Sequence, residues 1–193
     1  MALQKKTPTQ TYRTKVVVAG GQARNGKSTM CHLLQEQATM DGWHCQRFSF
    51  ADPLKSVVRM VQQDYVNKNA SSLQATSEEW KRNFGKGCFA KDMIGRLNAY
   101  VESVPPSISK ILVLIDDMRF PEELAALENW TSTGRELIKV RVQRPGFQSY
   151  DRDMSHDSET ILLNVPYEDY TISAVDMGEL EVDVTALWEQ VRS

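Results

Sequence analysis

The sequence predicts an α/β fold in which helices flank a doubly wound, largely parallel sheet of five strands. Three observations support this fold class. Short runs rich in valine, isoleucine and leucine alternate along the chain with longer stretches whose apolar residues recur at helical spacing. The run at residues 111–115 is apolar at every position, which is typical of a central parallel strand covered on both faces. A glycine-rich loop joins the first apolar run to the first helical stretch.

Turn-forming residues set the ends of the expected elements. Gly42 is placed to end the first helix, and Pro105 with Pro106 stops the helix before the 111–115 strand. Asp52 and Pro53 open the second helix as N-cap and first helical residue. Strands are predicted at residues 15–19, 45–50, 111–115, 136–142 and 170–173. Helices are predicted at residues 27–40, 52 to about 66, 77 onward, 89–104, 120–130 and 179–191. The polar stretches 67–76 and 144–158 are predicted to be loops.

The composition is that of one globular domain. The 193 residues are 41% hydrophobic and 25% charged, which is enough to bury one core. The formal net charge of −2 gives no overall basic field for nucleic acid or membrane. No apolar stretch approaches the roughly 18 residues of a membrane span, the N-terminus lacks a signal-peptide core, and the 3 cysteines have no metal-site spacing. We therefore expect a polar tail at residues 1–14, a single domain at 15–193, no membrane partner and a cytoplasmic location.

Residues 21–28 read G-Q-A-R-N-G-K-S, which matches the phosphate-binding pattern G-x-x-x-x-G-K-[ST] between a strand and a helix. Glycines let the loop backbone approach phosphates closely, with N–H groups pointing at their oxygens. The lysine supplies charge to the β- and γ-phosphates, and the next hydroxyl ligates Mg²⁺. The pattern therefore predicts a P-loop NTPase fold with ATP and Mg²⁺ as cofactors. The expected cofactor-binding residues are Gly21, Asn25, Gly26, Lys27, Ser28 and Thr29, with Thr29 near the α-phosphate.

Two adjacent acids, Asp116 and Asp117, directly follow the 111–115 strand. A P-loop site needs a carboxylate at the end of a neighbouring strand to orient Mg²⁺ or its water shell. Side chains of adjacent residues in an extended strand point to opposite faces, so one of the two acids is expected to face the metal. The other interpretation is a solvated strand end whose acids cap the next helix.

Three further stretches behind this loop make the sequence resemble the phage-type deoxynucleoside monophosphate kinases, with the animal phosphomevalonate kinases as distant relatives. They are F-A-D-P-L-K at 50–55, D-M-R-F-P-E-E at 117–123, and R-P-G at 144–146 followed by H-D-S-E at 156–159. The resemblance spans about residue 15 to the C-terminal helix. It implies an acceptor-binding helical region at about 52–104 and a lid loop at about 144–158. Residues 67–87, where acceptor specificity is expected to be decided, match the family poorly.

The resemblance also implies roles for single residues. The family's D-x-R element falls on Asp117 and Arg119, which favours Asp117 over Asp116 as the functional acid and as the Mg²⁺ ligand beside Ser28. The F-A-D-P-L-K segment implies that Asp52 and Lys55 contact the acceptor. Kinases of this type grip phosphates with arginines, which stay charged and bind phosphate bidentately; the candidates are Arg82, Arg96, Arg119 and Arg144. The implied catalytic set is Lys27, Asp52, Asp117, Arg119 and Arg144.

Several of these residues have a second interpretation. Asp52 could orient or deprotonate an acceptor hydroxyl, or it could act only as a helix cap. Arg144 could close over ATP as part of a lid, or it could be solvated in a polar loop. His156, which with Glu159 belongs to the H-D-S-E stretch, could cap a helix or contact phosphate. Trp80 is interpreted as a packing residue, and the alternative is that Trp80 and Phe84, next to Arg82, stack on a base.

The expected function is a kinase that transfers the γ-phosphate of ATP to a nucleotide-like acceptor, with a deoxynucleoside monophosphate preferred. The alternative acceptor is the hydroxyl of a hydroxymethylated pyrimidine, such as 5-hydroxymethyluridine, in phage DNA; a basic strip of Lys81, Arg82, Lys86 and Lys91 would support it. A third interpretation is a P-loop NTPase without a small acceptor. The expected partners are thus a nucleotide substrate or modified DNA. If the gene is phage-encoded, the cytoplasm is the host's, and a monomer and a homodimer both stay open.

Overall fold

The computed structural model describes residues 12–61, 70–147, 155–163 and 165–193. A sheet of five strands runs through the molecule in the order β2-β3-β1-β4-β5, and each neighbouring pair is parallel. The strands are β1 (Arg13–Gly20), β2 (His44–Phe48), β3 (Lys110–Met118), β4 (Glu136–Gln143) and β5 (Tyr170–Ser173). The predicted α/β class with a parallel five-stranded sheet is confirmed.

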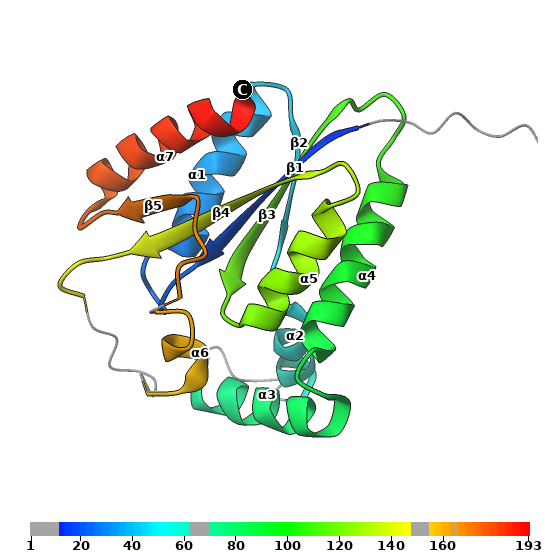
Figure 1. The fold of residues 1–193 in the computed structure, drawn as a ribbon, viewed down its shortest axis with the longest axis vertical. Helices are drawn as coiled ribbons and strands as arrows, with labels where there is room; N and C mark the ends of the chain where they lie inside the picture. The colour runs from blue at the N-terminus through cyan, green and yellow to red at the C-terminus, as the bar shows by residue number, and fades with distance from the viewer. Residues whose placement is uncertain (1–11, 62–69, 148–154, 164) are drawn as a thin grey trace, which may run out of the picture.

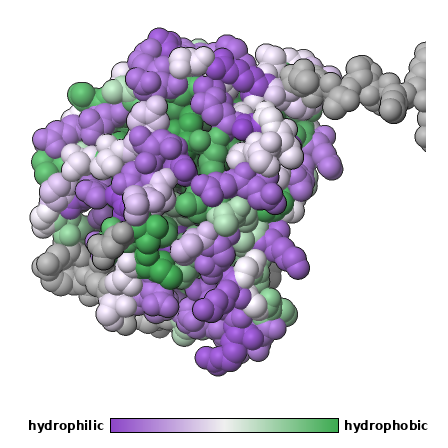
Figure 2. Space-filling model, viewed as in Figure 1, coloured by the Kyte–Doolittle hydropathy of each residue, from purple (hydrophilic) through white to green (hydrophobic). Residues whose placement is uncertain are grey.

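Helices cover both faces of the sheet (Figure 1). Helices α1 and α7 lie on one face, α4 and α5 lie on the other, and α2, α3 and α6 gather at the carboxyl ends of the strands. Figure 2 shows hydrophilic residues over most of the same view, with hydrophobic residues visible between the two helix layers. The helices are α1 (Lys27–Met40), α2 (Asp52–Val61), α3 (Ala70–Phe84), α4 (Cys88–Ser103), α5 (Pro121–Thr131), α6 (Asp157–Thr160) and α7 (Met177–Arg192). No helix in the described ranges is long and apolar enough to cross a membrane.

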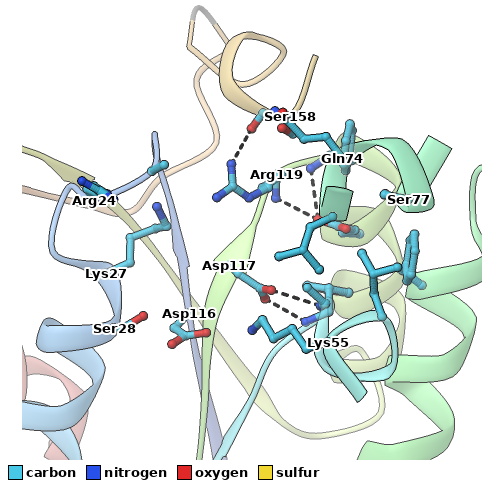
Figure 3. Close-up of a pocket in the computed structure, with 18 of the residues that line it drawn as sticks. Arg24, Lys27, Ser28, Lys55, Gln74, Ser77, Asp116, Asp117, Arg119 and Ser158 are labelled. Atoms are coloured by element: carbon cyan, nitrogen blue, oxygen red, sulfur yellow. Dashed lines mark hydrogen bonds between the residues drawn. The ribbon is translucent and has the colours of Figure 1, made fainter. Parts of the chain in front are cut away.

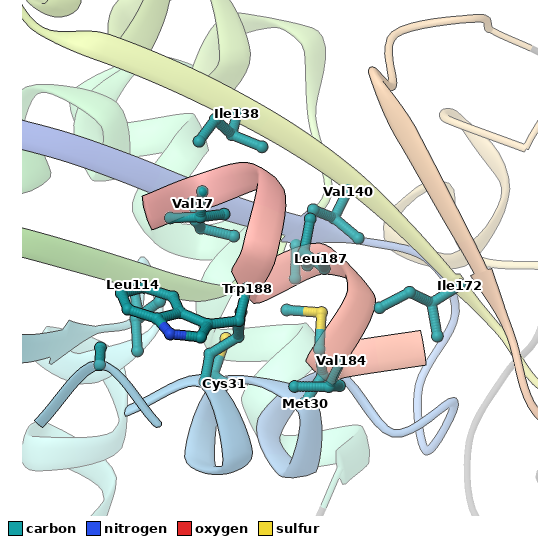
Figure 4. Close-up of a cluster of buried hydrophobic side chains, with 14 of the residues drawn as sticks. Val17, Met30, Cys31, Leu114, Ile138, Val140, Ile172, Val184, Leu187 and Trp188 are labelled. Atoms are coloured by element: carbon teal, nitrogen blue, oxygen red, sulfur yellow. The ribbon is translucent and has the colours of Figure 1, made fainter. Parts of the chain in front are cut away.

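The side-chain alternation of the central strands divides the core into two layers. In β1, Val17 packs with the α1 and α7 side chains, whereas Val16 and Val18 pack with those of α4 and α5. Figure 4 shows the first layer, in which Trp188 of α7 reaches across to α1. Its indole Nε1 donates a 2.9 Å hydrogen bond to Asp41, so the polar atom of a buried ring is satisfied. Both faces of the sheet are therefore covered, as a run of apolar residues in a parallel strand requires.

Most predicted elements agree with the structure to within a few residues, and the helix at 27–40 and the strand at 170–173 agree in both bounds. The predicted loop at 67–76 is wrong from Ala70 on, where α3 begins. This stretch is mostly polar, yet it forms an amphipathic helix. Leu73 and Trp80 lie two turns apart on it, and both pack against the α4 and α5 layer.

Other predicted boundaries also change. The loop predicted at 144–158 ends in α6, and the polar tail predicted at 1–14 ends where β1 begins at Arg13. Parts of these predictions lie outside the described residues: 1–11 of the tail, 62–66 of the second helix, 67–69 of the first loop and 148–154 of the lid loop.

Candidate active site

The glycine loop joins β1 to α1 at the carboxyl edge of the sheet. Gly21 has a φ of 125°, and a Cβ built there would lie 2.3 Å from the carbonyl oxygen of Val142 in β4. Gly26 has a φ of 94°, which is also in the left-handed region that favours glycine. The side-chain amide of Asn25 donates to the same Val142 oxygen at 3.3 Å. The first glycine of the pattern is thus required by close packing on β4 as well as by backbone conformation.

Lys27 lies across this loop. Its Nζ donates a 2.8 Å hydrogen bond to the carbonyl of Gly21, and only 6% of the residue is exposed. Burial, with a smaller contribution from the nearby charge of Arg119, lowers the pKa of Lys27 to about 7, and the carboxylates around it act in the opposite direction. A phosphate bound in the loop would favour the charged form of this lysine, which couples its charge to the presence of an anion.

The start of α1 suits an anionic ligand. Gly26 is the N-cap residue, and as a glycine it has no side chain with which to cap the first amides of the helix. Those amides carry the positive end of the helix dipole and lack intrahelical acceptors, so a phosphate can satisfy them. Gly26, Ser28 and Thr29 line a cavity at this point. The residues present therefore fit ATP, with the Ser28 hydroxyl available to a metal ion.

The two acids after the buried run of β3, Asp116 and Asp117, lie on opposite faces of the sheet. Because Leu114 packs on the α1 side and Ile115 on the α4 side, alternation places Asp116 toward α1 and Asp117 toward α4. Figure 3 shows Asp116 on the same side as Ser28, with Asp117 turned away from it. Asp116 also accepts a 2.9 Å hydrogen bond from Arg47. The Mg²⁺ role implied for Asp117 stays a prediction, and Asp116 is the acid that the fold brings to the side of Ser28.

Asp117 instead binds the turn between β2 and α2. Its carboxylate accepts hydrogen bonds from the backbone amides of Phe50 at 2.7 Å and Ala51 at 3.1 Å, and from the hydroxyl of Ser49. Lys55 donates to that hydroxyl at 2.7 Å, which directs the hydroxyl proton toward Asp117. The end of β3 is thereby fastened to the segment that the sequence associates with the acceptor.

Asp52 and Arg96 support the same turn from outside the cavity. Asp52 accepts a 2.9 Å hydrogen bond from the amide of Ser49, and Arg96 donates to the carbonyl of Ser49 at 2.9 Å. The two side chains also lie 3.4 Å apart at their charged ends. Neither residue is among those that line the cavity. Their predicted contact with the acceptor stays a prediction, while their observed contacts hold the turn.

Arg119 is joined to the phosphate loop through Glu159. The Glu159 carboxylate has no exposed surface, pairs with Arg119 and accepts a 2.8 Å hydrogen bond from the amide of Ala23. Arg119 also donates to the carbonyl of Ser158 at 2.9 Å (Figure 3). Glu159 is thus an important residue of the site that the sequence marked only as part of the H-D-S-E stretch. His156 caps α6 by accepting from the amide of Ser158, which confirms the capping interpretation.

Glu123 is a second buried acid at the site that sequence reasoning missed. It accepts hydrogen bonds from the amides of Arg119 at 2.8 Å and Phe120 at 3.1 Å, and so holds the start of α5. Burial raises the pKa of Glu123 to about 8, with a smaller contribution in the same direction from Asp117. Its place three residues after Phe120, in the capping-box position, was the available sequence signal.

One cavity of about 860 Å³ joins these parts (Figure 3). Its donor side carries the phosphate loop and Asp116, and its other side is formed by the start of α2, by α3 and by Phe89 of α4. Of the predicted site residues, the cavity gathers Gly26, Lys27, Ser28, Thr29, Lys55, Asp117 and Arg119. It does not include the exposed residues Arg82 and Arg144, and the Arg144 guanidinium lies 4.9 Å from the ring centre of Phe147.

The sequence matches no protein-family model and no curated protein. Among solved structures, the chain is similar to the APS kinase of Mycobacterium tuberculosis in complex with AMPPNP and APS, with 13% identity and a TM-score of 0.52 over 94% of this chain and 99% of that chain. A cysteine-to-alanine variant of that kinase gives 14% identity, the same TM-score and the same coverage.

The hexameric APS kinase from Thiobacillus denitrificans is 10% identical, with a TM-score of 0.52 over 96% of this chain and 30% of that chain. At these identities the similarity concerns the fold, and membership of the phage-type kinase family stays a prediction. The parallel sheet, the glycine loop between β1 and α1, and these similarities together show that the chain has the P-loop NTPase fold predicted from its sequence.

Proposed function

We propose that the chain is an ATP-dependent kinase that transfers the γ-phosphate to a nucleotide-like acceptor, with a deoxynucleoside monophosphate as the preferred acceptor. One observation carries the proposal. A single cavity continues from Lys27 and Ser28, where a triphosphate would bind, to a recess lined by Phe50, Leu54 and Phe89. A phosphate loop alone would suit any nucleotide hydrolase, whereas an adjoining recess gives a second substrate a place beside the γ-phosphate.

On the donor side, the loop amides and Lys27 would hold the β- and γ-phosphates. Ser28 would ligate Mg²⁺ together with a carboxylate, for which Asp117 is the candidate by resemblance and Asp116 the candidate by position. When bound, Mg²⁺ supplies neutralising charge between the phosphates. Arg119, held by Glu159 next to the loop, adds a second cation to this side of the cavity.

On the acceptor side, Lys55 is the cation that the cavity offers near the recess. Its Nζ donates a 2.7 Å hydrogen bond to the Ser49 hydroxyl, and that hydroxyl in turn donates a hydrogen bond to the Asp117 carboxylate. A monophosphate bound at Lys55 would lie in the same cavity as a triphosphate bound at Lys27, because both lysines line it. Positioning of two phosphates in this way accounts for most of what such an enzyme must do.

A second candidate acceptor is a hydroxymethylated pyrimidine in DNA. The observation that favours it is the C-terminal end of α3, where Phe84 is 72% exposed and has the exposed Arg82 and Lys86 two residues before and after it. An exposed aromatic ring between cations suits a single strand of nucleic acid. The expected basic strip is nonetheless incomplete, because the Lys81 side chain is largely buried. Its Nζ pairs with the Glu78 carboxylate at 3.0 Å and lies 3.6 Å from the ring centre of Phe120.

Label transfer from γ-labelled ATP tests the proposal. The protein is incubated with each deoxynucleoside monophosphate, with DNA that contains 5-hydroxymethyluracil, with APS, and with no acceptor. We expect label on one or more monophosphates. Label on the modified DNA alone would support the second candidate acceptor. Label on APS alone would contradict both candidate acceptors. Steady release of free phosphate with no labelled acceptor would overturn the kinase proposal.

A further inference from the structure

We propose that Gln74 and Ser77 of α3 contact the base of the acceptor nucleotide and set which base the site prefers. This inference rests on the proposed kinase function, since it assigns residues of the same cavity to a part of its acceptor.

The side-chain amide of Gln74 is the first observation. Its Nε2 is buried, and it has no hydrogen-bond partner within the described part of the chain. Buried amide donors are almost always paired in folded proteins, because an unpaired donor loses its water without compensation. Gln74 also lines the cavity, so a rotation of its carboxamide would bring this Nε2 to an acceptor atom of a bound ligand.

The position of Ser77 is the second observation. Ser77 lies three residues after Gln74, so both side chains project from the same face of α3, and both line the cavity. Figure 3 shows them on the opposite side of the cavity from Lys27. A carboxamide offers a donor and an acceptor side by side, which matches the edge of a nucleobase, and a hydroxyl can serve in either sense.

The surroundings favour a base over a phosphate at this wall. Gln74 and Ser77 are uncharged, and their neighbours in the lining include Leu73 and Phe89. Phe89 is held in place by Trp80, whose ring stacks on it with centroids 5.8 Å apart and planes 10° apart. A flat ring can pack against such an apolar surface while its edge meets the polar pair. The cations of the lining that suit a phosphate come from other elements; they are Arg24, Lys27, Lys55 and Arg119.

Binding of the four deoxynucleoside monophosphates to the ATP-free protein, measured by calorimetry, tests this inference apart from catalysis. The variants are Gln74→Leu, which keeps the size and removes the amide, and Ser77→Ala. The control is Gln46→Leu, because Gln46 is exposed on the edge strand β2. We expect Gln74→Leu to weaken binding of the preferred nucleotide about tenfold and to reduce the spread of affinities among the four bases. Ser77→Ala should change the order of preference, and the control should match the wild type.

Unchanged affinities and order in Gln74→Leu, with a melting temperature that shows a folded protein, would overturn the inference even if the wild type is an active kinase. Failure of the wild type to bind any of the four nucleotides would overturn it as well. If binding depends on the base and on Gln74 but no label is transferred, the proposed kinase function fails while the base contact stands. In the wild type and in both variants, the kcat/KM values for the four acceptors should rank in the same order as the affinities. The kcat of each variant at saturating acceptor should stay close to that of the wild type.

Discussion

The backbone amide of Ala23 in the phosphate loop donates a 2.8 Å hydrogen bond to the carboxylate of Glu159, which lies 136 residues away in the sequence. The same carboxylate pairs with Arg119 at the end of β3, and it has no exposed surface. One buried charge therefore fixes the loop, the arginine and the helix α6 relative to one another. Because removal of one member of a buried ion pair leaves the other without compensation, this contact has consequences for both stability and activity.

The variant Glu159→Gln should keep the shape and the hydrogen bond from Ala23 but lose the charge that holds Arg119. We expect a loss of stability of about 2 to 3 kcal/mol and a fall in kcat of roughly tenfold or more. Urea unfolding and label transfer measure the two effects. The control is Glu128→Gln, whose half-exposed carboxylate pairs with Lys139 at 3.4 Å and should matter little. Equal behaviour of the two variants would contradict the role given to Glu159.

Asn substitutions at Asp116 and Asp117 should give different kinetic signatures. Asp116→Asn should raise the Mg²⁺ concentration needed for half-maximal transfer, because Asp116 lies on the side of Ser28. Asp117→Asn should raise the KM for the acceptor by roughly tenfold with ATP affinity little changed, because three donors of the 49–51 turn depend on its carboxylate. The rate of transfer by both variants, measured over a range of Mg²⁺ concentrations, shows which of the two acids serves the metal. The opposite pattern would support the assignment of Asp117 to the metal.

The buried carboxyl of Glu123 should make stability depend on pH. Its pKa is raised to about 8 by burial, whereas in the unfolded chain it titrates near the ordinary value of 4.5. Between these values the unfolded state binds fewer protons, so stability should fall as pH rises from about 5 to about 8, by up to about 1.4 kcal/mol per pH unit. Glu123→Gln should flatten this dependence in urea unfolding at pH 5, 6, 7 and 8, and Glu122→Gln should not. An equal slope in wild type and Glu123→Gln would show that the carboxyl does not titrate in this range.

The variant Gly21→Ala should abolish ATP binding and destabilise the protein. Its Cβ would lie 2.3 Å from the backbone oxygen of Val142, and the backbone at Gly21 is in a conformation that favours glycine. Gly85→Ala is the matched control, since Gly85 has a φ of 87° but no atom within 4 Å of the added carbon. We expect a cost of about 1 to 2 kcal/mol from backbone strain in Gly85→Ala, with ATP affinity unchanged. Similar loss in both variants would mean that strain alone, not contact with β4, explains the glycine at 21.

Much of the fold could be predicted because its signals are local. The apolar run of β3 and the glycine pattern after β1 each depend on neighbouring residues, and both were interpreted correctly at the level of the fold. The start of α3 was missed because its helical character depends on Leu73 and Trp80 packing against α4 and α5. Polar composition alone cannot reveal such tertiary packing.

The candidate site was less predictable because its contacts join distant residues. Nothing near Glu159 in the sequence points to Ala23, and nothing near Asp117 shows that its hydrogen bonds go to the turn after β2. Alternation along a strand says that Asp116 and Asp117 face opposite ways, but the covering helices decide which of them faces Ser28. Arg82 was chosen for residue type and Arg144 also for its place in the R-P-G stretch, and both are exposed outside the cavity.

The rate of phosphate transfer in Lys27→Ala tests the central claim most directly. Lys27 lies across the phosphate loop and lines the cavity. The control Lys110→Ala changes an exposed lysine at the first residue of β3, whereas the cavity lies at the carboxyl end of that strand. With the acceptor that the wild type labels best, we expect Lys27→Ala to transfer phosphate at least roughly a hundredfold more slowly, and Lys110→Ala to match the wild type. Transfer by a folded Lys27→Ala protein at the wild-type rate would contradict a phosphate-loop kinase mechanism.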